Sequence, residues 1–173
     1  GLVQDGKVWM GGDSAGSGYV LQTRSDPKVF ATGEFVIGYT TSFRMGQLLQ
    51  HVFSPPTPHE GDDDMAYMVK RFIPATKSVF AKNGYERSNS GQDRAGTYLV
   101  GYRGHLYYVE DDYQVGRMAE PYCACGSGVK LALGSLHTTE DLGWSPKKRI
   151  KAALRAAEHF ESGVSSPFHI VHT

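Results

Sequence analysis

The sequence predicts an α+β fold in which two β-sheets pack face to face and two helices cover each outer side, a four-layer αββα sandwich. One observation is the order of elements, which runs strand hairpins, two helices, strand hairpins, two helices and a closing strand. The other is that each half-apolar strand and helix must bury its apolar face against a neighbouring layer. A chain of 173 residues suits one core, so we expect a single domain over residues 1–173.

Turn residues and β-forming runs mark the strands. Asp5-Gly6 lies between two such runs and is the strongest short hairpin signal in the chain, and Thr32-Gly33 marks a second hairpin. The expected strands lie at residues 2–4, 7–12, 19–23, 28–31, 34–39, 96–102, 105–110, 115–122 and 168–171. Residues 83–94 are polar and contain glycine, which favours a loop.

Capping residues mark the helices. The first helix is expected after Ser42, a candidate N-cap, and the last after Ser145-Pro146, where serine caps and proline takes the first helical position. Between them, one helix follows the aspartates at 62–64, and another opens at Gly-Ser-Gly, residues 126–128. Glycines and a serine at a helix start leave free backbone N–H groups and let another group approach.

Three features of these helices predict further detail. Three consecutive aspartates complement a helix dipole, or they open a calcium loop, although the further ligands and closing Glu of such loops are absent. Pro74 is expected to kink the second helix. The basic residues at 147–149, 151 and 155 are expected to face water, or else to contact an acidic partner.

Composition restricts the function. Eighteen basic and eighteen acidic residues give a net charge of zero, so the totals show no footprint for nucleic acid or an anionic membrane. No apolar run approaches the roughly 20 residues of a membrane span, which predicts a cytoplasmic protein. Cys123 and Cys125 are expected to be small buried residues, because a zinc site would need further Cys or His ligands. No metal or other cofactor is predicted.

The stretch from Lys7 to Ser14, followed by residues 26–30, predicts a site. A strand that ends in the carboxylate of Asp13, and a loop that returns Lys28 near it, can hold one ammonium beside one carboxylate at the end of a sheet. Gly-Gly-Asp-Ser is also an ordinary turn, because glycine reaches positive φ easily and Asp and Ser bond nearby backbone.

Five motifs in the same order and spacing resemble those of proteasome β-subunits and HslV-type peptidases, which are N-terminal nucleophile hydrolases. They are Gly-Gly-Asp-Ser at 11–14, Pro-Lys-Val at 27–29, Ile-Gly-Tyr-Thr-Thr-Ser at 37–42, Gly-Ser-Gly at 126–128 and Ser-Gly at 162–163. The resemblance covers nearly the whole chain. It implies an αββα sandwich in which an N-terminal threonine attacks a peptide carbonyl, with its own α-amine, of pKa about 8, as the general base.

The resemblance also implies roles for particular residues. Asp13 would orient Lys28, whose charge would favour loss of the hydroxyl proton. The backbone N–H of Thr41 would point to the oxyanion position. Ser127 and Ser162 would bond the terminal amine.

Substrate would be bound by another small group of residues. Ser17, Gly38 and Tyr39 are the candidates, and Tyr39 lies close to where the family lines its first specificity pocket.

Two positions depart from the family pattern. Gly1 has no side chain and cannot be the nucleophile; alignment on Asp13 puts the expected threonine about four residues before it, so we expect a few native residues upstream. His159 stands where many proteasome subunits carry an aspartate, and Glu158 or Glu161 could be turned in instead.

Two other functions remain open at this point. A catalytically silent, structural ring subunit would explain the missing nucleophile, whereas a Ser-His-Asp hydrolase is disfavoured because no Gly-x-Ser-x-Gly elbow occurs. The resemblance further implies a homo-oligomeric ring that acts on protein or peptide substrates, with an ATP-dependent unfoldase as a possible partner. Neither nucleic acid nor a membrane is expected as a partner.

Overall fold

The computed structural model describes all residues except 17, 19, 86, 90 and 91, and it contains two main antiparallel sheets. The first has the order β1-β2-β12 and comprises β1 (Leu2–Gln4), β2 (Lys7–Gly12) and β12 (His169–His172). The second has the order β11-β10-β9-β6-β5 and comprises β5 (Val29–Thr32), β6 (Phe35–Tyr39), β9 (Tyr98–Tyr102), β10 (His105–Val109) and β11 (Val115–Arg117).

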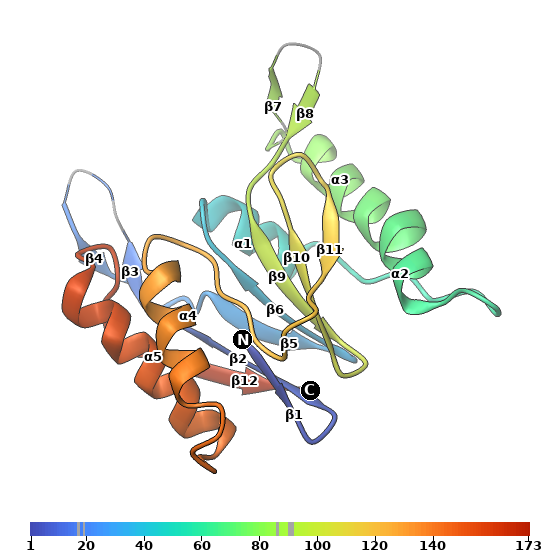
Figure 1. The fold of residues 1–173 in the computed structure, drawn as a ribbon. Helices are drawn as coiled ribbons and strands as arrows, with labels where there is room; N and C mark the ends of the chain where they lie inside the picture. The colour runs from blue at the N-terminus through green and yellow to red at the C-terminus, as the bar shows by residue number, and fades with distance from the viewer. Residues whose placement is uncertain (17, 19, 86, 90–91) are drawn as a thin grey trace.

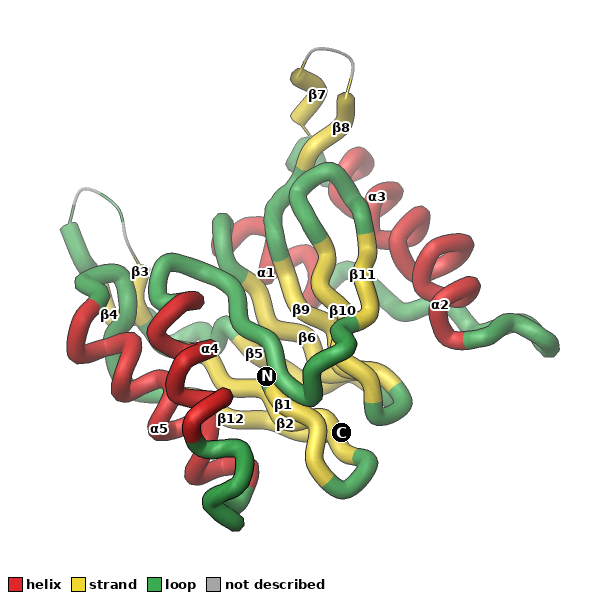
Figure 2. Tube along the Cα trace, viewed as in Figure 1, coloured by secondary structure: helices red, strands yellow, loops and turns green. Residues whose placement is uncertain are grey.

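Helices lie on the outer side of both sheets (Figure 1). On one side are α4 (Val129–Thr138) and α5 (Pro146–Phe160), which cover the three-stranded sheet. On the other are α1 (Phe43–His51), α2 (Asp64–Tyr67), the π-helical η1 (Met68–Phe72) and α3 (Ile73–Lys82). Figure 2 shows the two helical layers in red on either side of the yellow strands. The predicted αββα sandwich is therefore confirmed.

Three apolar clusters fill the three spaces between four layers. Val8, Met10, Val36 and Leu99 belong to the cluster between the sheets, where β2 meets β5, β6 and β9. A larger aromatic cluster lies between the five-stranded sheet and α1 to α3. A third lies between the other sheet and the pair α4 and α5. Each fully buried large side chain contributes roughly 1.5–3 kcal/mol, so all three spaces stabilise the fold.

The strand predictions need three corrections. The strand expected at 19–23 is reduced among described residues to β4 (Gln22–Thr23), which pairs with β3 (Ala15–Gly16). The strand expected at 115–122 ends at Arg117, and Tyr122 only bridges to Leu2. The loop expected at 83–94 instead contains a hairpin of β7 (Arg87–Asn89) and β8 (Gln92–Arg94), which projects from the body in Figure 1.

The structure adds detail to one helix prediction and corrects another. Pro74 lies at the start of α3, directly after η1, where the Ile73 N–H reaches back five residues to the Met68 carbonyl. A π-helical turn thus directly precedes the proline, which is disfavoured in a helix interior. Arg149 does not face water: it is 5% exposed and donates from Nη2 to the Leu136 carbonyl at the end of α4, 2.8 Å away.

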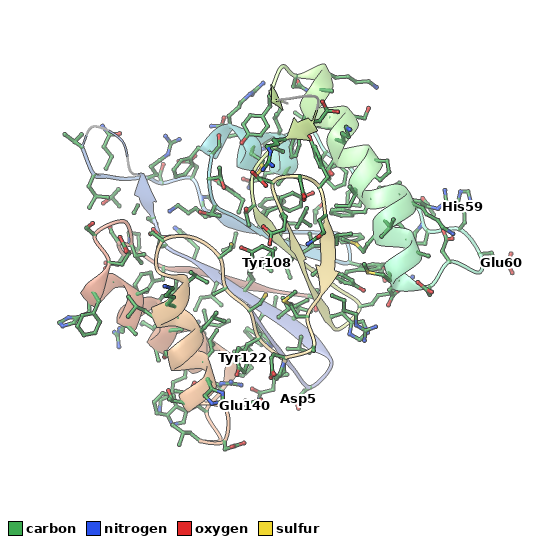
Figure 3. The ribbon with its side chains drawn as sticks, turned by 45° about the horizontal axis from the view of Figure 1, so that its top comes forward. Asp5, His59, Glu60, Tyr108, Tyr122 and Glu140 are labelled. Atoms are coloured by element: carbon green, nitrogen blue, oxygen red, sulfur yellow. The ribbon has the colours of Figure 1, made fainter. Side chains whose placement is uncertain are left out.

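The hairpins and loops reach away from these layers. Asp5 lies at the tip of the β1–β2 hairpin, and His59 and Glu60 lie on the loop that extends from the body before α2 (Figure 3). Asp5-Gly6 forms the predicted turn, with φ of 52° and 72°. No helix within the described part of the chain is long and apolar enough to cross a membrane.

Candidate active site

A cavity of about 320 Å³ lies where the first sheet, α5 and the segment before α4 meet. Its lining brings together residues far apart in the sequence: Asp13, Lys28, Gly38, Tyr39, Thr41 and Ser127. Of the predicted site residues, Ser162 is exposed and does not line it, and Ser17 lies outside the described residues.

The centre of the cavity is an ion pair. Lys28 Nζ lies 2.9 and 3.0 Å from the two carboxylate oxygens of Asp13, and the two side chains are 16% and 15% exposed. Asp13 follows β2 and also accepts the Ala15 N–H at 2.7 Å, while Lys28 directly precedes β5. A Cβ at Gly12 would lie 3.2 Å from Lys28 Cβ, so glycine permits this close approach.

Thr41 forms a strained turn at the cavity wall. Its φ is 69°, and the Ser42 N–H reaches back to the Thr40 carbonyl at 2.7 Å, which makes Thr41 the central residue of a γ-turn. The Thr41 N–H has no acceptor among the described residues. Helix α1 begins two residues later, with Ser42 as its N-cap, so its positive dipole end adjoins this turn.

The opposite wall is the segment 124–128 with the end of α5. Ser127 is exposed at the cavity, and a Cβ at Gly163 would lie 2.9 Å from its Oγ and 3.4 Å from Glu161 Oε1. Glu161 accepts the Gly163 N–H at 3.0 Å, so its carboxylate lies on the Ser127 side of the helix end.

The two other candidates for the family's aspartate point elsewhere. His159 is exposed and packs edge-on against Phe160, with 4.5 Å between ring centroids. Glu158 accepts the Ser166 N–H at 2.6 Å. Of the three side chains at this helix end, Glu161 is therefore the one whose carboxylate and the Ser127 Oγ both lie close to the position of a Gly163 Cβ.

A free strand edge borders the cavity. On one side Gly11 and Gly12 of β2 pair with β12, but no described strand pairs with them on the other side. Across the cavity from this edge run Ala124 to Ser127. Strand β1 lies between this edge and the segment that contains Cys123. Just before β1, the Gly1 N–H donates to the Cys123 carbonyl at 2.7 Å, and the Gly1 carbonyl accepts the Cys123 N–H at 3.0 Å.

The cysteines are unsuited to nucleophilic attack. Cys123 is 4% exposed, and Cys125 is partly exposed and lines the cavity. Burial raises the pKa of Cys123, and it raises that of Cys125 to about 12, so both thiols are protonated at neutral pH. Because the thiolate is the reactive form, neither thiol supplies the nucleophile.

Gly38 and Tyr39, the last two residues of β6, form part of the cavity wall. A Cβ at Gly38 would lie 2.5 Å from Met10 Sδ, so a larger residue there would displace the Met10 side chain. The Tyr39 ring packs directly over Gly46 of α1, and burial raises the pKa of its hydroxyl to about 12. Both residues thus shape the cavity without offering it a titrating group.

Sequence reasoning missed one contact of the site. The Thr97 N–H donates to Thr41 Oγ1 at 3.2 Å, and its carbonyl accepts the Thr40 N–H at 3.2 Å. The residues are 56 positions apart, and no local pattern indicates such a pairing.

The acidic stretch at 62–64 is occupied by other interactions. Its first carboxylate lies 2.7 Å from Arg71, its second caps α2 through the Ala66 N–H, and its third lies 3.3 Å from Arg103. No group of three or more His, Cys, Asp or Glu side chains among the described residues could hold a metal ion.

Comparison with known proteins shows the fold. No family model matches the sequence, and no curated protein matches it significantly. Among solved structures, BPH of Thiobacillus denitrificans in complex with epoxomicin is 17% identical, with a TM-score of 0.78 over 99% of this chain and 95% of that chain. A second BPH structure is 16% identical with a TM-score of 0.77 and the same coverage.

The third structure is eukaryotic HslV from Trypanosoma brucei, which is 14% identical, with a TM-score of 0.68 over 99% of this chain and 95% of that chain. At these identities the likeness establishes architecture alone. The chain has the four-layer αββα fold of the N-terminal nucleophile hydrolases.

Proposed function

We propose that this chain is a threonine-type peptidase of a self-compartmentalising ring similar to HslV and the proteasome. The observation that carries the proposal is the mostly buried pair of Lys28 and Asp13 within one cavity, beside the β2 edge that no described strand pairs with. The ammonium of a lysine beside this edge can interact with a side chain on any strand that pairs with the edge. We place that group, the threonine, about four residues before Gly1, within the same single domain.

The strand registers support this position. Leu2 bridges antiparallel to Tyr122, so each step back from Gly1 moves one step forward from Cys123. A strand continued by four residues would bring the fourth opposite Ser127. On its other side it would pair with Gly11, Gly12 and the residues that follow, which lie next to the ammonium of Lys28.

The chemistry follows from this placement. The threonine hydroxyl oxygen attacks the peptide carbonyl carbon as its proton passes to the α-amine, whose ordinary pKa is about 8. Lys28 stabilises the developing alkoxide, and Asp13 holds Lys28 in position. The negative carbonyl oxygen is stabilised by the Thr41 N–H.

Breakdown of the intermediate returns that proton. The C–N bond breaks, the ammonium protonates the leaving nitrogen, and an ester to threonine remains. The amine then takes a proton from water, the hydroxide attacks the ester carbonyl, and the second product leaves with regeneration of the hydroxyl.

One group before α4 and one after the end of α5 would hold the amine. We assign this role to Ser127, with the carboxylate of Glu161 in place of the family's aspartate. Ser162, exposed and outside the cavity lining, is a weaker candidate, and His159 points away. A carboxylate near the amine favours its protonated form and orients it towards the hydroxyl.

A silent structural subunit remains the alternative function, but the ion pair disfavours it. Burying a lysine and a carboxylate costs desolvation energy, and replacing such a pair with apolar residues is often neutral or stabilising for a fold. A subunit that only needed the fold would have little use for the pair. As further parts of the proposal, the ring is homo-oligomeric and cytoplasmic, accepts protein or peptide substrates and works with an ATP-dependent unfoldase.

The test uses the full natural chain. The first residue and intact mass of the mature protein are determined, and hydrolysis of a fluorogenic peptide is followed. We expect a free threonine about four residues before Gly1, and loss of hydrolysis when it is changed to alanine. A blocked start together with no hydrolysis would favour the silent subunit. Native mass and electron microscopy of the same sample test the ring.

A further inference from the structure

Thr41 has a backbone conformation that costs energy for its residue type. A φ of 69° is routine for glycine, but for a β-branched residue it is a genuine outlier. The γ-turn centred on Thr41 is also the rare, strained form. Such strain persists only where surrounding contacts over-determine it, and it concentrates at functional sites.

The contacts that hold this turn come from the segment before β9. The Thr97 N–H donates to Thr41 Oγ1 at 3.2 Å, and the Thr97 carbonyl accepts the Thr40 N–H at 3.2 Å. Thr97 therefore holds the turn from both sides, once through the backbone and once through the Thr41 hydroxyl.

Gly96 makes this approach close enough. A Cβ on Gly96 would lie 2.9 Å from Thr41 Cβ and 3.1 Å from Met45 Sδ. Any larger residue would displace the turn or Thr97. The segment before β9 is thus shaped to fit the Thr41 side chain.

We propose that the Thr41 hydroxyl is a tether that fixes the strained turn with the Thr41 N–H available to the oxyanion. Thr41 then contributes twice, with its N–H as the donor and its side chain as a positioning group that acts through Thr97. This inference rests on the proposed peptidase function. It adds that the orientation of the Thr41 N–H is fixed by the Thr41 side chain as well as by the backbone hydrogen bonds of the turn.

Ser42 does not replace the tether. Its hydroxyl accepts the Arg44 N–H at 3.1 Å and caps α1, which fixes the residue after the strained one. The Thr40 backbone bond to Thr97 fixes the residue before. Between them the γ-turn bond from the Ser42 N–H to the Thr40 carbonyl closes the turn, and the contacts of the Thr41 side chain itself are its hydroxyl bond to Thr97 and its close packing on Gly96.

Three variants of the full, active chain test the tether. Thr41→Val keeps the shape but loses the hydroxyl, Thr41→Ser keeps the hydroxyl, and Thr41→Gly loses the side chain but adopts positive φ without strain. Thr57→Val, on the exposed loop before α2, is the matched control. The assays are kcat and KM with a fluorogenic peptide and hydrogen exchange of the Thr97 amide by mass spectrometry.

For Thr41→Val we expect kcat to fall about tenfold or more, with KM within about twofold. The loss should stay smaller than the roughly 10²- to 10³-fold that removal of a whole oxyanion donor costs, because the N–H itself remains. Thr41→Ser should stay near wild type, and Thr41→Gly should exceed Thr41→Val. The Thr97 amide should exchange faster in Thr41→Val and Thr41→Gly, which both lack the accepting hydroxyl, than in Thr41→Ser and the control.

The outcomes separate the two proposals. Full kcat for Thr41→Val in an active chain, or an unchanged Thr97 amide, overturns the tether and leaves the peptidase standing. A mature chain with no hydrolysis overturns the peptidase and the catalytic role of the tether together. A simple folding defect would lower the yield of all three variants without the rescue by Thr41→Ser.

Discussion

Replacing Lys28 with alanine should abolish peptide hydrolysis and leave the fold and assembly intact. Lys28 Nζ contacts both carboxylate oxygens of Asp13 at 2.9 and 3.0 Å and lines the cavity into which the nucleophile is proposed to project. Without the ammonium, the hydroxyl loses the charge that favours release of its proton. The change therefore removes a group that acts on the reacting atoms.

The magnitudes separate catalysis from stability. A positioned proton-transfer or charge-stabilising group contributes about 10²- to 10⁴-fold, which is roughly 3–5 kcal/mol of activation free energy. Breaking a fully buried ion pair costs about 3–5 kcal/mol of stability. The cost here should be smaller, about 1–3 kcal/mol, because Asp13 is 15% exposed and keeps the Ala15 N–H. A domain stable by about 5–15 kcal/mol remains folded after that loss.

The assay is hydrolysis of a fluorogenic peptide by the full mature chain, with native mass for assembly and urea unfolding for stability. Lys28→Met, which keeps most of the side-chain volume, accompanies Lys28→Ala. Lys147→Ala, on the exposed face of α5, is the control. Hydrolysis within about threefold of wild type in both Lys28 variants would refute the assigned role. Loss of assembly in both would mean that the lysine is structural.

Three further substitutions test other parts of the structure. Glu161→Gln should lower kcat about tenfold and move the acid limb of the pH–rate profile to lower pH, because a nearby carboxylate raises the pKa of an amine, whereas Glu158→Gln should change neither. In urea unfolding, Arg149→Ala should lower the free energy of unfolding by about 2–4 kcal/mol, because it opens a cavity and removes the 2.8 Å hydrogen bond to the Leu136 carbonyl, which keeps only the longer bond of 3.4 Å from Thr139 Oγ1. The hydrogen bond from Arg71 holds the pKa of Asp62 below its ordinary 3.8, so the stability from this pair is present above pH 3.8 and lost as the pH falls through the folded pKa. Asp62→Asn should therefore be less stable than wild type at pH 7 and equal to it near pH 2, measured by denaturation at both pH values.

Features set by neighbouring residues could be predicted from the sequence. Asp5-Gly6 has the positive φ values of its hairpin turn, Ser42 caps α1 through the Arg44 N–H, and Ser145 caps α5. In each case the signal and its structural consequence lie within three residues. The αββα layering followed because each element's apolar face needs a partner layer.

Features that depend on distant partners could not be predicted. Arg149 belongs to a run of basic residues that looks like a solvated face, and only the packing of α5 on α4 shows that its guanidinium binds the carbonyl of Leu136. The β7–β8 hairpin was missed because its strands are polar and lack the apolar alternation that marks a half-buried strand. The contact between Thr41 and Thr97 joins segments whose sequences carry no mark of each other.

Three features that cost folding free energy lie at one cavity, and their coincidence favours a catalytic role over a purely structural one. The pair of Asp13 and Lys28 is desolvated, Thr41 holds a strained φ, and the edge of β2 at Gly11 and Gly12 is left unpaired among the described residues. The first two could be relieved without changing the fold. Thr41→Gly removes the strain, and the double change Asp13→Asn with Lys28→Met removes both charges while keeping an acceptor for the Ala15 N–H. If the cavity is an active site, both changes should leave the free energy of unfolding unchanged or raise it. The double change should abolish hydrolysis, a combination that a purely structural site does not produce.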